Sequence, residues 1–212
     1  MLDLRAGSYL LDAAMGTALI ARGLRGRAPE WNLTRPADVR DVHLVHLAAG
    51  ADILLTNTFV GASAEEATAA IRIARGAGAR WVAGSLWAGL PDLPRQIAQL
   101  EKADIIWLES ATSADQAMHA VRTAGAYTRL PIAITCAMRS APLQDLREAG
   151  ASAAGYNCTP WPDDPAGADI LKPDSAGLEP PAWAAVVGTA RMRGGCCGTD
   201  ERYLAALRAT SR

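Results

Sequence analysis

The sequence predicts an α/β fold built around a parallel sheet, and two observations carry that prediction. Eight short apolar runs recur along the 212 residues, at spacings that leave room for a helix between most of them. Each run is almost continuously apolar rather than alternating, which is typical of parallel strands covered on both faces. The runs are Tyr9–Ala13, Asp52–Asn57, Trp81–Leu86, Ile105–Glu109, Pro131–Ala137, Ala153–Cys158, Asp169–Lys172 and Met192–Cys196.

The segments between these runs carry helix signals. Ser63 and Glu66 form a capping box ahead of an apolar helical face. Ser113 is placed to cap a second helix, and Thr199 to cap a last helix whose first turn is acidic. Eight strands that alternate with helices indicate a (β/α)8 TIM barrel.

One connection departs from this pattern. Only ten residues, three of them proline, separate Cys158 from Asp169. Proline is excluded from helix interiors, and a parallel crossover usually takes a dozen or more residues. We therefore expect a loop in place of the helix between the sixth and seventh strands. No change in composition marks a second domain, so residues 1–212 are predicted to form one compact barrel, shorter than the usual ~250 residues.

The composition argues against several classes of partner. Lys and Arg number 21 and Asp and Glu number 22, a formal net charge of −1, whereas nucleic-acid-binding proteins normally carry a basic excess. No apolar run is long enough to cross a bilayer, and the N-terminus lacks the features of a secretory signal. The sequence therefore predicts a cytoplasmic protein with no nucleic-acid or membrane partner, in a compartment where thiols stay reduced.

Three of the four cysteines lie at the carboxyl ends of predicted strands. Cys158 ends the sixth run, and Cys196 and Cys197 end the eighth between glycines. Barrel enzymes place their active sites at these strand ends, and three thiolates there match a zinc site whose fourth position is open to substrate. Inert buried thiols, or a disulfide between Cys196 and Cys197, are the alternatives. Cys136 lies within a strand and is expected to be a core thiol.

The ligand set itself points to a reaction class. Three thiolates make a bound zinc ion too electron-rich for hydrolysis, but suit it to holding a substrate thiol as a nucleophilic thiolate. The expected chemistry is alkyl transfer to sulfur. His43 and His46, three residues apart on a helix outside the barrel, are a much weaker candidate metal pair.

A series of short motifs, taken in their order along the chain, also supports the predicted zinc site. These motifs are Leu11–Thr17, His43 with Ala49–Asp52, Thr56–Phe59, Trp107–Glu109, Asn157–Cys158 and Gly194–Thr199. Together they resemble the homocysteine S-methyltransferases, which include betaine- and S-methylmethionine-dependent enzymes and the homocysteine domain of cobalamin-dependent methionine synthase. The resemblance implies a (β/α)8 barrel that transfers a methyl group to the thiol of homocysteine to give methionine.

The resemblance also implies roles for individual residues. Zn²⁺ would be bound by the three cysteines at the strand ends, Cys158, Cys196 and Cys197. The two acids that hold the amino group of homocysteine in the family match Asp12 and Glu109. Asn157 is expected to orient a thiolate or the neighbouring loop. The loops around the amino-acid end of the substrate match Gly16, Thr17, Asn57 and Thr58.

The chain departs from the family pattern in several ways, two of them at single positions or short motifs. Ala13 stands where many members have glycine, and Lys172-Pro173-Asp174 replaces a common Pro-Asn pair.

The methyl donor stays open between a methyl-corrinoid on a separate protein and a small onium compound such as betaine or S-methylmethionine. Shortened loops and an aromatic content of only 5% favour the carrier protein. Trp87 and Trp161 could face the donor, since aromatic rings attract onium cations, or could serve packing alone. The alternative function is a barrel that binds zinc or thiols as a sensor or scaffold, without catalysis.

Overall fold

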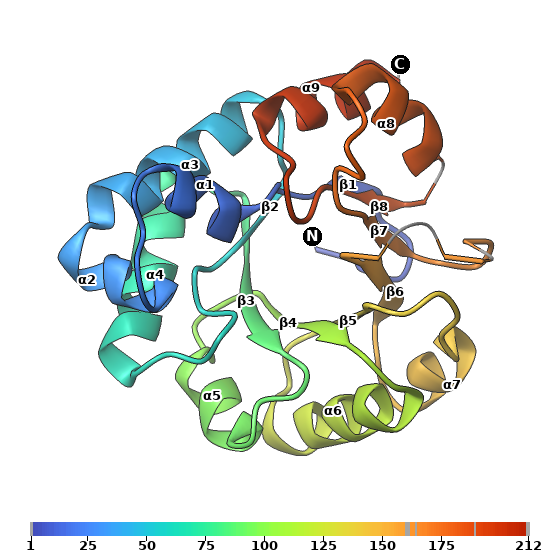
Figure 1. Cartoon of the computed structure of the whole chain (residues 1–212). Helices are drawn as coiled ribbons and strands as arrows, with labels where there is room; N and C mark the ends of the chain where they lie inside the picture. The colour runs from blue at the N-terminus through green and yellow to red at the C-terminus, as the bar shows by residue number, and fades with distance from the viewer. Residues whose placement is uncertain (1, 160–161, 164, 189, 211–212) are drawn as a thin grey trace.

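The computed structural model describes residues 2–159, 162–163, 165–188 and 190–210. It contains eight parallel strands in one sheet, in the order β1-β8-β7-β6-β5-β4-β3-β2. A parallel bridge from Leu11 to Ile53 links β1 to β2, so the barrel is nearly closed (Figure 1). The strands are β1 Tyr9–Leu10, β2 Ile53–Leu55, β3 Trp81–Trp87, β4 Ile105–Ala111, β5 Ile132–Cys136, β6 Ala153–Asn157, β7 Ile170–Lys172 and β8 Met192–Arg193.

Helices surround this barrel in Figure 1. Each of the eight predicted runs overlaps one of the strands, with β3 and β4 continuing one and two residues beyond their runs, which confirms the predicted TIM-barrel-like fold. None of the described helices is long and apolar enough to cross a membrane. The helices are α1 Met15–Ala21, the 3₁₀ turn η1 Ala28–Glu30, α2 Trp31–Thr34, α3 Pro36–Ala48, α4 Ala64–Ala77, α5 Leu93–Gln99, α6 Ala114–Tyr127, α7 Leu143–Glu148, α8 Pro180–Val187 and α9 Glu201–Ala209.

The caps of three helices test the local sequence signals. Ser63 and Glu66 form the expected capping box of α4, and Ser113 accepts a hydrogen bond from the Gln116 amide at the start of α6. The prediction for the last helix was wrong by one residue. Asp200, not Thr199, is the N-cap of α9, where its carboxylate accepts a hydrogen bond from the Arg202 amide.

The connection from β6 to β7 contains no helix among its described residues, as the prolines predicted. Every other strand is followed by at least one helix before the next strand begins. β6 is thus the one strand with no helix described between it and the next strand, and Cys158 directly follows it.

Strand side chains alternate between two apolar layers. In β4, Ile105 and Trp107 belong to the barrel interior, whereas Ile106 and Leu108 pack in the cluster shared with the surrounding helices. Leu4, from the segment before β1, joins the interior cluster. The inside of the barrel is therefore a packed core, and ligands must bind at a strand end.

Candidate functional site

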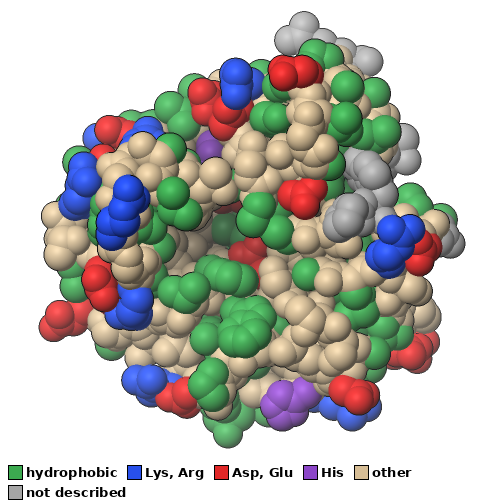
Figure 2. Space-filling view, viewed as in Figure 1, with side chains coloured by type: hydrophobic (Ala, Val, Ile, Leu, Met, Phe, Trp, Pro, Cys, Tyr) green, Lys and Arg blue, Asp and Glu red, His purple; other side chains and the backbone are tan. Residues whose placement is uncertain are grey.

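A cavity of about 360 Å³ opens at the carboxyl ends of the strands. Figure 2 shows it as a hollow near the centre of that face, with apolar side chains around it. Residues at or just beyond the ends of seven strands line it, β5 being the exception among the described elements. The polar and cysteine residues of the wall are Asp12, Thr17, Thr56, Asn57, Ser85, Glu109, Ser110, Asn157, Cys158, Lys172, Cys196 and Cys197.

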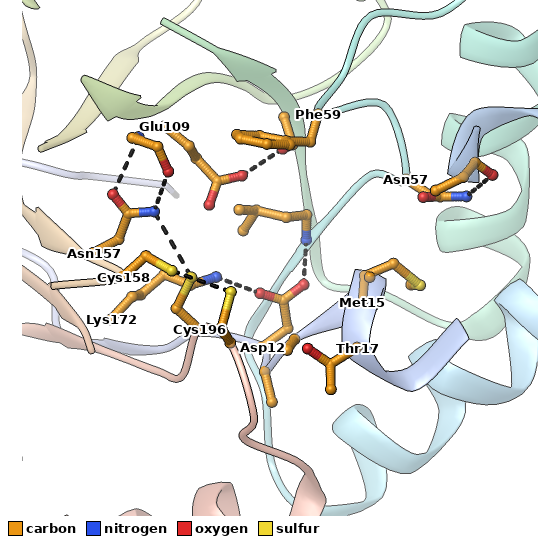
Figure 3. Close-up of a pocket in the computed structure, with 18 of the residues that line it drawn as sticks. Asp12, Met15, Thr17, Asn57, Phe59, Glu109, Asn157, Cys158, Lys172 and Cys196 are labelled. Atoms are coloured by element: carbon orange, nitrogen blue, oxygen red, sulfur yellow. Dashed lines mark hydrogen bonds and ion pairs between the residues drawn. The ribbon is translucent and has the colours of Figure 1, made fainter. Parts of the chain in front are cut away.

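The three cysteines meet at one side of this cavity (Figure 3). Their sulfur atoms all lie within 4.8 Å of one another, and the Cys158 and Cys197 sulfurs are 3.1 Å apart. The cysteines are free thiols, so Cys196 and Cys197 do not form a disulfide. They are the one group of three potential metal ligands found among the described residues.

Local backbone geometry explains how adjacent cysteines can share a site. Strand β8 ends at Arg193, earlier than predicted, so Cys196 and Cys197 lie in a turn rather than on opposite faces of a strand. A Cβ at Gly194 would lie 2.6 Å from the Leu11 Cβ, so only glycine lets this turn approach β1 so closely. Thr199, freed from capping, donates its hydroxyl to the Cys196 carbonyl at 2.7 Å and closes the turn.

Cys158 reaches the same point through a strained backbone. Its φ of +48° lies in the left-handed region, which costs a non-glycine residue of the order of 1–3 kcal/mol and is concentrated at functional sites. This conformation turns the residue that follows β6 toward the turn that follows β8. The cluster therefore forms from two irregular segments, each directly beyond a regular strand.

The pKa values of the cysteine thiols are shifted in opposite directions. Hydrogen bonds from Cys158 and Cys196 lower the pKa of Cys197 to about 3, while the bond to Cys158 raises the pKa of Cys196 well above its usual value. Tetrahedral Zn–S bonds of about 2.3 Å would separate the sulfurs by about 3.8 Å, close to the spacing in this cluster. The donor set and its spacing fit a zinc ion.

Asp12 lies beyond β1 and is buried with a lysine. Its Oδ1 accepts a hydrogen bond from Lys172 Nζ at 2.7 Å, and its Oδ2 accepts one from the Leu55 amide at 2.8 Å. Burial lowers the pKa of Lys172, but attraction to Asp12 and Glu109 outweighs this effect and leaves the pKa raised. Lys172 is therefore an ammonium in the floor of the cavity.

Glu109 lies on β4 at a shift in the pairing register with β5. Its carboxylate accepts a hydrogen bond from the Ser85 hydroxyl, and burial raises its pKa above the usual value. The next residue, Ser110, has a φ of +59°. Asn157 holds this bulge, because its side chain accepts from the Ser110 amide at 3.1 Å and donates to the Ser110 hydroxyl at 2.9 Å.

Asn157 also donates toward the Cys196 sulfur, at 3.9 Å. One side chain thus connects the strand that carries Glu109 with the cysteine cluster, and it is placed for the orienting role the sequence suggested.

Three of the four residues predicted to surround the substrate line the cavity, and the fourth does not. Gly16 and Thr17 begin α1 and line the cavity, and the Thr17 hydroxyl accepts from the Gly198 amide at 3.3 Å. Asn57 also lines it, with its amide group donating to the Ala28 carbonyl and to Asn32. Thr58 is buried away from the lining and donates to the Ser85 carbonyl at 2.7 Å.

Two residues of the site were given no role in it from the sequence. Ser85 is a polar residue inside the apolar run of β3, and Lys172 is a charge at the end of the apolar run of β7. Each is a polar residue in an otherwise apolar strand, and this interruption was the feature of the sequence that could have marked it as a site residue. What each side chain contacts depends on other strands.

The remaining candidates have other surroundings. Cys136 is fully buried in the helix-facing core, and burial raises its pKa to about 12, as expected for an inert thiol. Trp87 is the last residue of β3, is partly exposed and does not line the cavity. Trp161 lies outside the described residues. His43 and His46 are buried on α3, and no metal-binding group that includes them is found in the described part of the chain.

His43 makes folding depend on pH. Both ring nitrogens are buried without a hydrogen-bond partner among the described residues, and burial lowers the pKa from 6.5 to about 4. The unfolded chain therefore takes up this proton first, and stability should fall as the pH drops below 6.5, by about 2 kcal/mol at pH 5. Urea unfolding at pH 7.5 and pH 5 should show a smaller difference for His43→Leu than for the wild type.

The exposed His119 provides the control for removal of one histidine. His119→Gln should keep the wild-type difference between the two pH values. An equal difference in wild type and His43→Leu would contradict the assignment.

Comparison with known proteins agrees with this geometry. The family model described as homocysteine S-methyltransferase matches residues 9–87, which confirms the resemblance over the part of the chain that holds Asp12, Gly16 and Asn57. The three cysteines lie beyond the matched residues. No curated protein sequence matches the chain significantly.

Solved structures match over nearly the whole chain. The apo form of the homocysteine methyltransferase MmuM from Escherichia coli has a TM-score of 0.75 at 23% identity, and the match covers 97% of this chain and 96% of that one. Its metallated form has the same TM-score at 22% identity, over 97% of both chains. A truncated 3-deoxy-D-arabino-heptulosonate 7-phosphate synthase from Thermotoga maritima reaches 0.52 at 13% identity, over 95% and 85%. These likenesses confirm the fold.

Proposed function

We propose that this chain, which resembles the homocysteine S-methyltransferases, is a zinc-dependent enzyme that transfers a methyl group to the thiol of homocysteine to give methionine. The observation that carries the proposal is the meeting of three cysteine sulfurs, from the segments that follow β6 and β8, in a cavity that also contains a buried acid, Glu109. Cys158, Cys196 and Cys197 would hold the zinc ion.

The sulfur ligands explain why zinc would be needed. A free thiol with a pKa of about 8.5 is only a few per cent ionised at neutral pH, and zinc bound by these cysteines would keep the acceptor sulfur as a nucleophilic thiolate. The surroundings of Cys197 support this role, because hydrogen bonds from Cys158 and Cys196 lower its pKa and favour its thiolate. Asn157 would fix the orientation of Cys196 through the contact of its side-chain amide with the Cys196 sulfur.

The other end of the acceptor would lie against the acids. Glu109 is buried, is oriented by Ser85, and faces the same cavity as the cysteines. An ammonium bound to it would compensate a charge that burial otherwise disfavours. Gly16 and Thr17, at the start of α1, and Asn57 would form the wall around the amino-acid portion.

The reaction needs no further co-reactant. The acceptor thiol releases its proton to solvent when it binds as a thiolate. Its sulfur then forms a bond to the methyl carbon as the bond from that carbon to the donor breaks, and the donor leaves with the bonding electron pair. Methionine and the demethylated donor are the products.

The mouth of the cavity favours a donor presented by a second protein. Ile20, Phe59 and Val60 line the cavity and are 59%, 38% and 50% exposed. An apolar rim of this kind is typical of an interaction surface. A small onium donor would instead need an enclosed aromatic pocket.

A donor comparison tests the function. Reduced, zinc-loaded protein would be incubated with homocysteine and, in separate reactions, methylcobalamin, S-methylmethionine and betaine, with methionine measured by mass spectrometry. We expect methionine with at least one donor and none from protein without zinc. Activity with betaine alone would contradict the carrier donor. Binding of homocysteine with no methyl transfer from any of the three would favour the sensor or scaffold function.

A further inference from the structure

The floor of the cavity contains a buried ion pair that the zinc chemistry does not require. Lys172 Nζ lies 2.7 Å from Asp12 Oδ1, and the two side chains are only 3% and 1% exposed. Both residues line the cavity. In Figure 3 the Lys172 side chain runs beside Cys158 and Cys196 toward Asp12.

This pair changes what Asp12 can bind. Its two oxygens already accept from Lys172 and from the Leu55 amide. The positive charge that would otherwise come from a ligand is supplied by the protein itself. An acceptor ammonium would therefore meet one uncompensated acid, Glu109, instead of two.

Lys172 also brings a positive charge to the acceptor. It is the one lysine or arginine among the described residues that line the cavity. An ammonium has three N–H donors, and Asp12 is the acceptor that the described residues provide for Nζ. The Trp107 ring, 6.0 Å from Nζ, borders the lysine on another side and accepts no conventional hydrogen bond. Nζ is therefore equipped to bind an anion in the cavity as well as Asp12.

We propose that Lys172 binds the carboxylate of the acceptor thiol, so that the site selects its acceptor chiefly by that carboxylate and holds the ammonium through Glu109 alone. This inference rests on the proposed function, since it assumes that a thiol binds at the cysteine cluster. It assigns a specificity-determining role to a residue at which the chain departs from the family pattern.

Two analogues of homocysteine, each lacking one charged group, test the proposal on the wild-type protein. 4-Mercaptobutanoate lacks the ammonium, and 3-aminopropane-1-thiol lacks the carboxylate. Binding to zinc-loaded protein would be measured by calorimetry, without a methyl donor. We expect loss of the carboxylate to weaken binding at least about tenfold more than loss of the ammonium, because a charge-assisted hydrogen bond at a buried site is lost. The reverse order would overturn the proposal.

A neutral pair of substitutions tests the residue itself. Lys172→Met alone would leave Asp12 buried without a partner and could prevent folding, so the double variant Asp12→Asn with Lys172→Met is preferred. In a folded double variant, homocysteine and 3-aminopropane-1-thiol should bind within about threefold of each other. A retained preference for the carboxylate would overturn the role of Lys172.

The outcomes separate the inference from the function. If homocysteine binds but 3-aminopropane-1-thiol binds equally well to the wild type, the inference fails and the thiol site stands. If none of the three thiols binds the zinc-loaded protein, both fail.

Discussion

Protein purified under reducing conditions should contain one zinc ion per chain, and Cys158→Ala, Cys196→Ala and Cys197→Ala should each lose it. The three sulfurs lie within 4.8 Å of one another, so removal of any one leaves two protein ligands, fewer than zinc sites use. Zinc affinity and methyl transfer should both fall by more than about a hundredfold, beyond the effect of altering an outer-shell contact. Elemental analysis and a competing chelator would measure the loss.

Cys136→Ala is the matched control. Cys136 is the fourth cysteine and is buried in the core, with a pKa raised to about 12. This variant should bind one zinc ion per chain like the wild type, although the small cavity it leaves lowers stability. A metal-free wild-type sample that is folded and fully active would refute the metal site, as would a Cys158→Ala variant with unchanged zinc content.

Gly155→Ala should strongly destabilise the folded protein. Gly155 pairs with Ile170 between β6 and β7, and an added Cβ would overlap the Ile170 carbonyl, whose carbon would be 2.7 Å away. Backbone atoms of a central strand cannot yield as a flexible side chain does, so we expect a loss of more than about 3 kcal/mol. For a domain of this size that corresponds to a fall in melting temperature of about 10 °C.

Gly125→Ala, also a replacement of glycine by alanine, should instead raise the stability of the protein. Gly125 lies within α6, and a Cβ there would meet nothing within 4 Å. Alanine is the better helix former, so this variant should gain about 0.5–1 kcal/mol. Thermal unfolding followed by circular dichroism would compare the two variants. Equal stability of Gly155→Ala and wild type would show that β6 and β7 are not packed as described.

The local sequence signals succeeded where one segment decides the outcome. The apolar runs located all eight strands, and three prolines predicted a connection after β6 whose described residues form no helix. Burial on both faces and loss of a backbone donor are properties of the segment alone. They failed at Thr199. Both Thr199 and Asp200 are good N-cap residues. Asp200 caps α9 because the Thr199 hydroxyl donates its hydrogen bond to the Cys196 carbonyl instead.

What the sequence by itself determined is the barrel and the placement of Cys158, Cys196 and Cys197 beyond two of its strands, because parallel strands bring their carboxyl ends to one rim. Only the tertiary structure decided that Cys158 takes a left-handed backbone, that Ser85 orients Glu109, and that Lys172 neutralises Asp12 across 160 residues of chain. The physical reason is that the charge and partner of a buried side chain depend on which strands lie beside it, and no local pattern of residues records that.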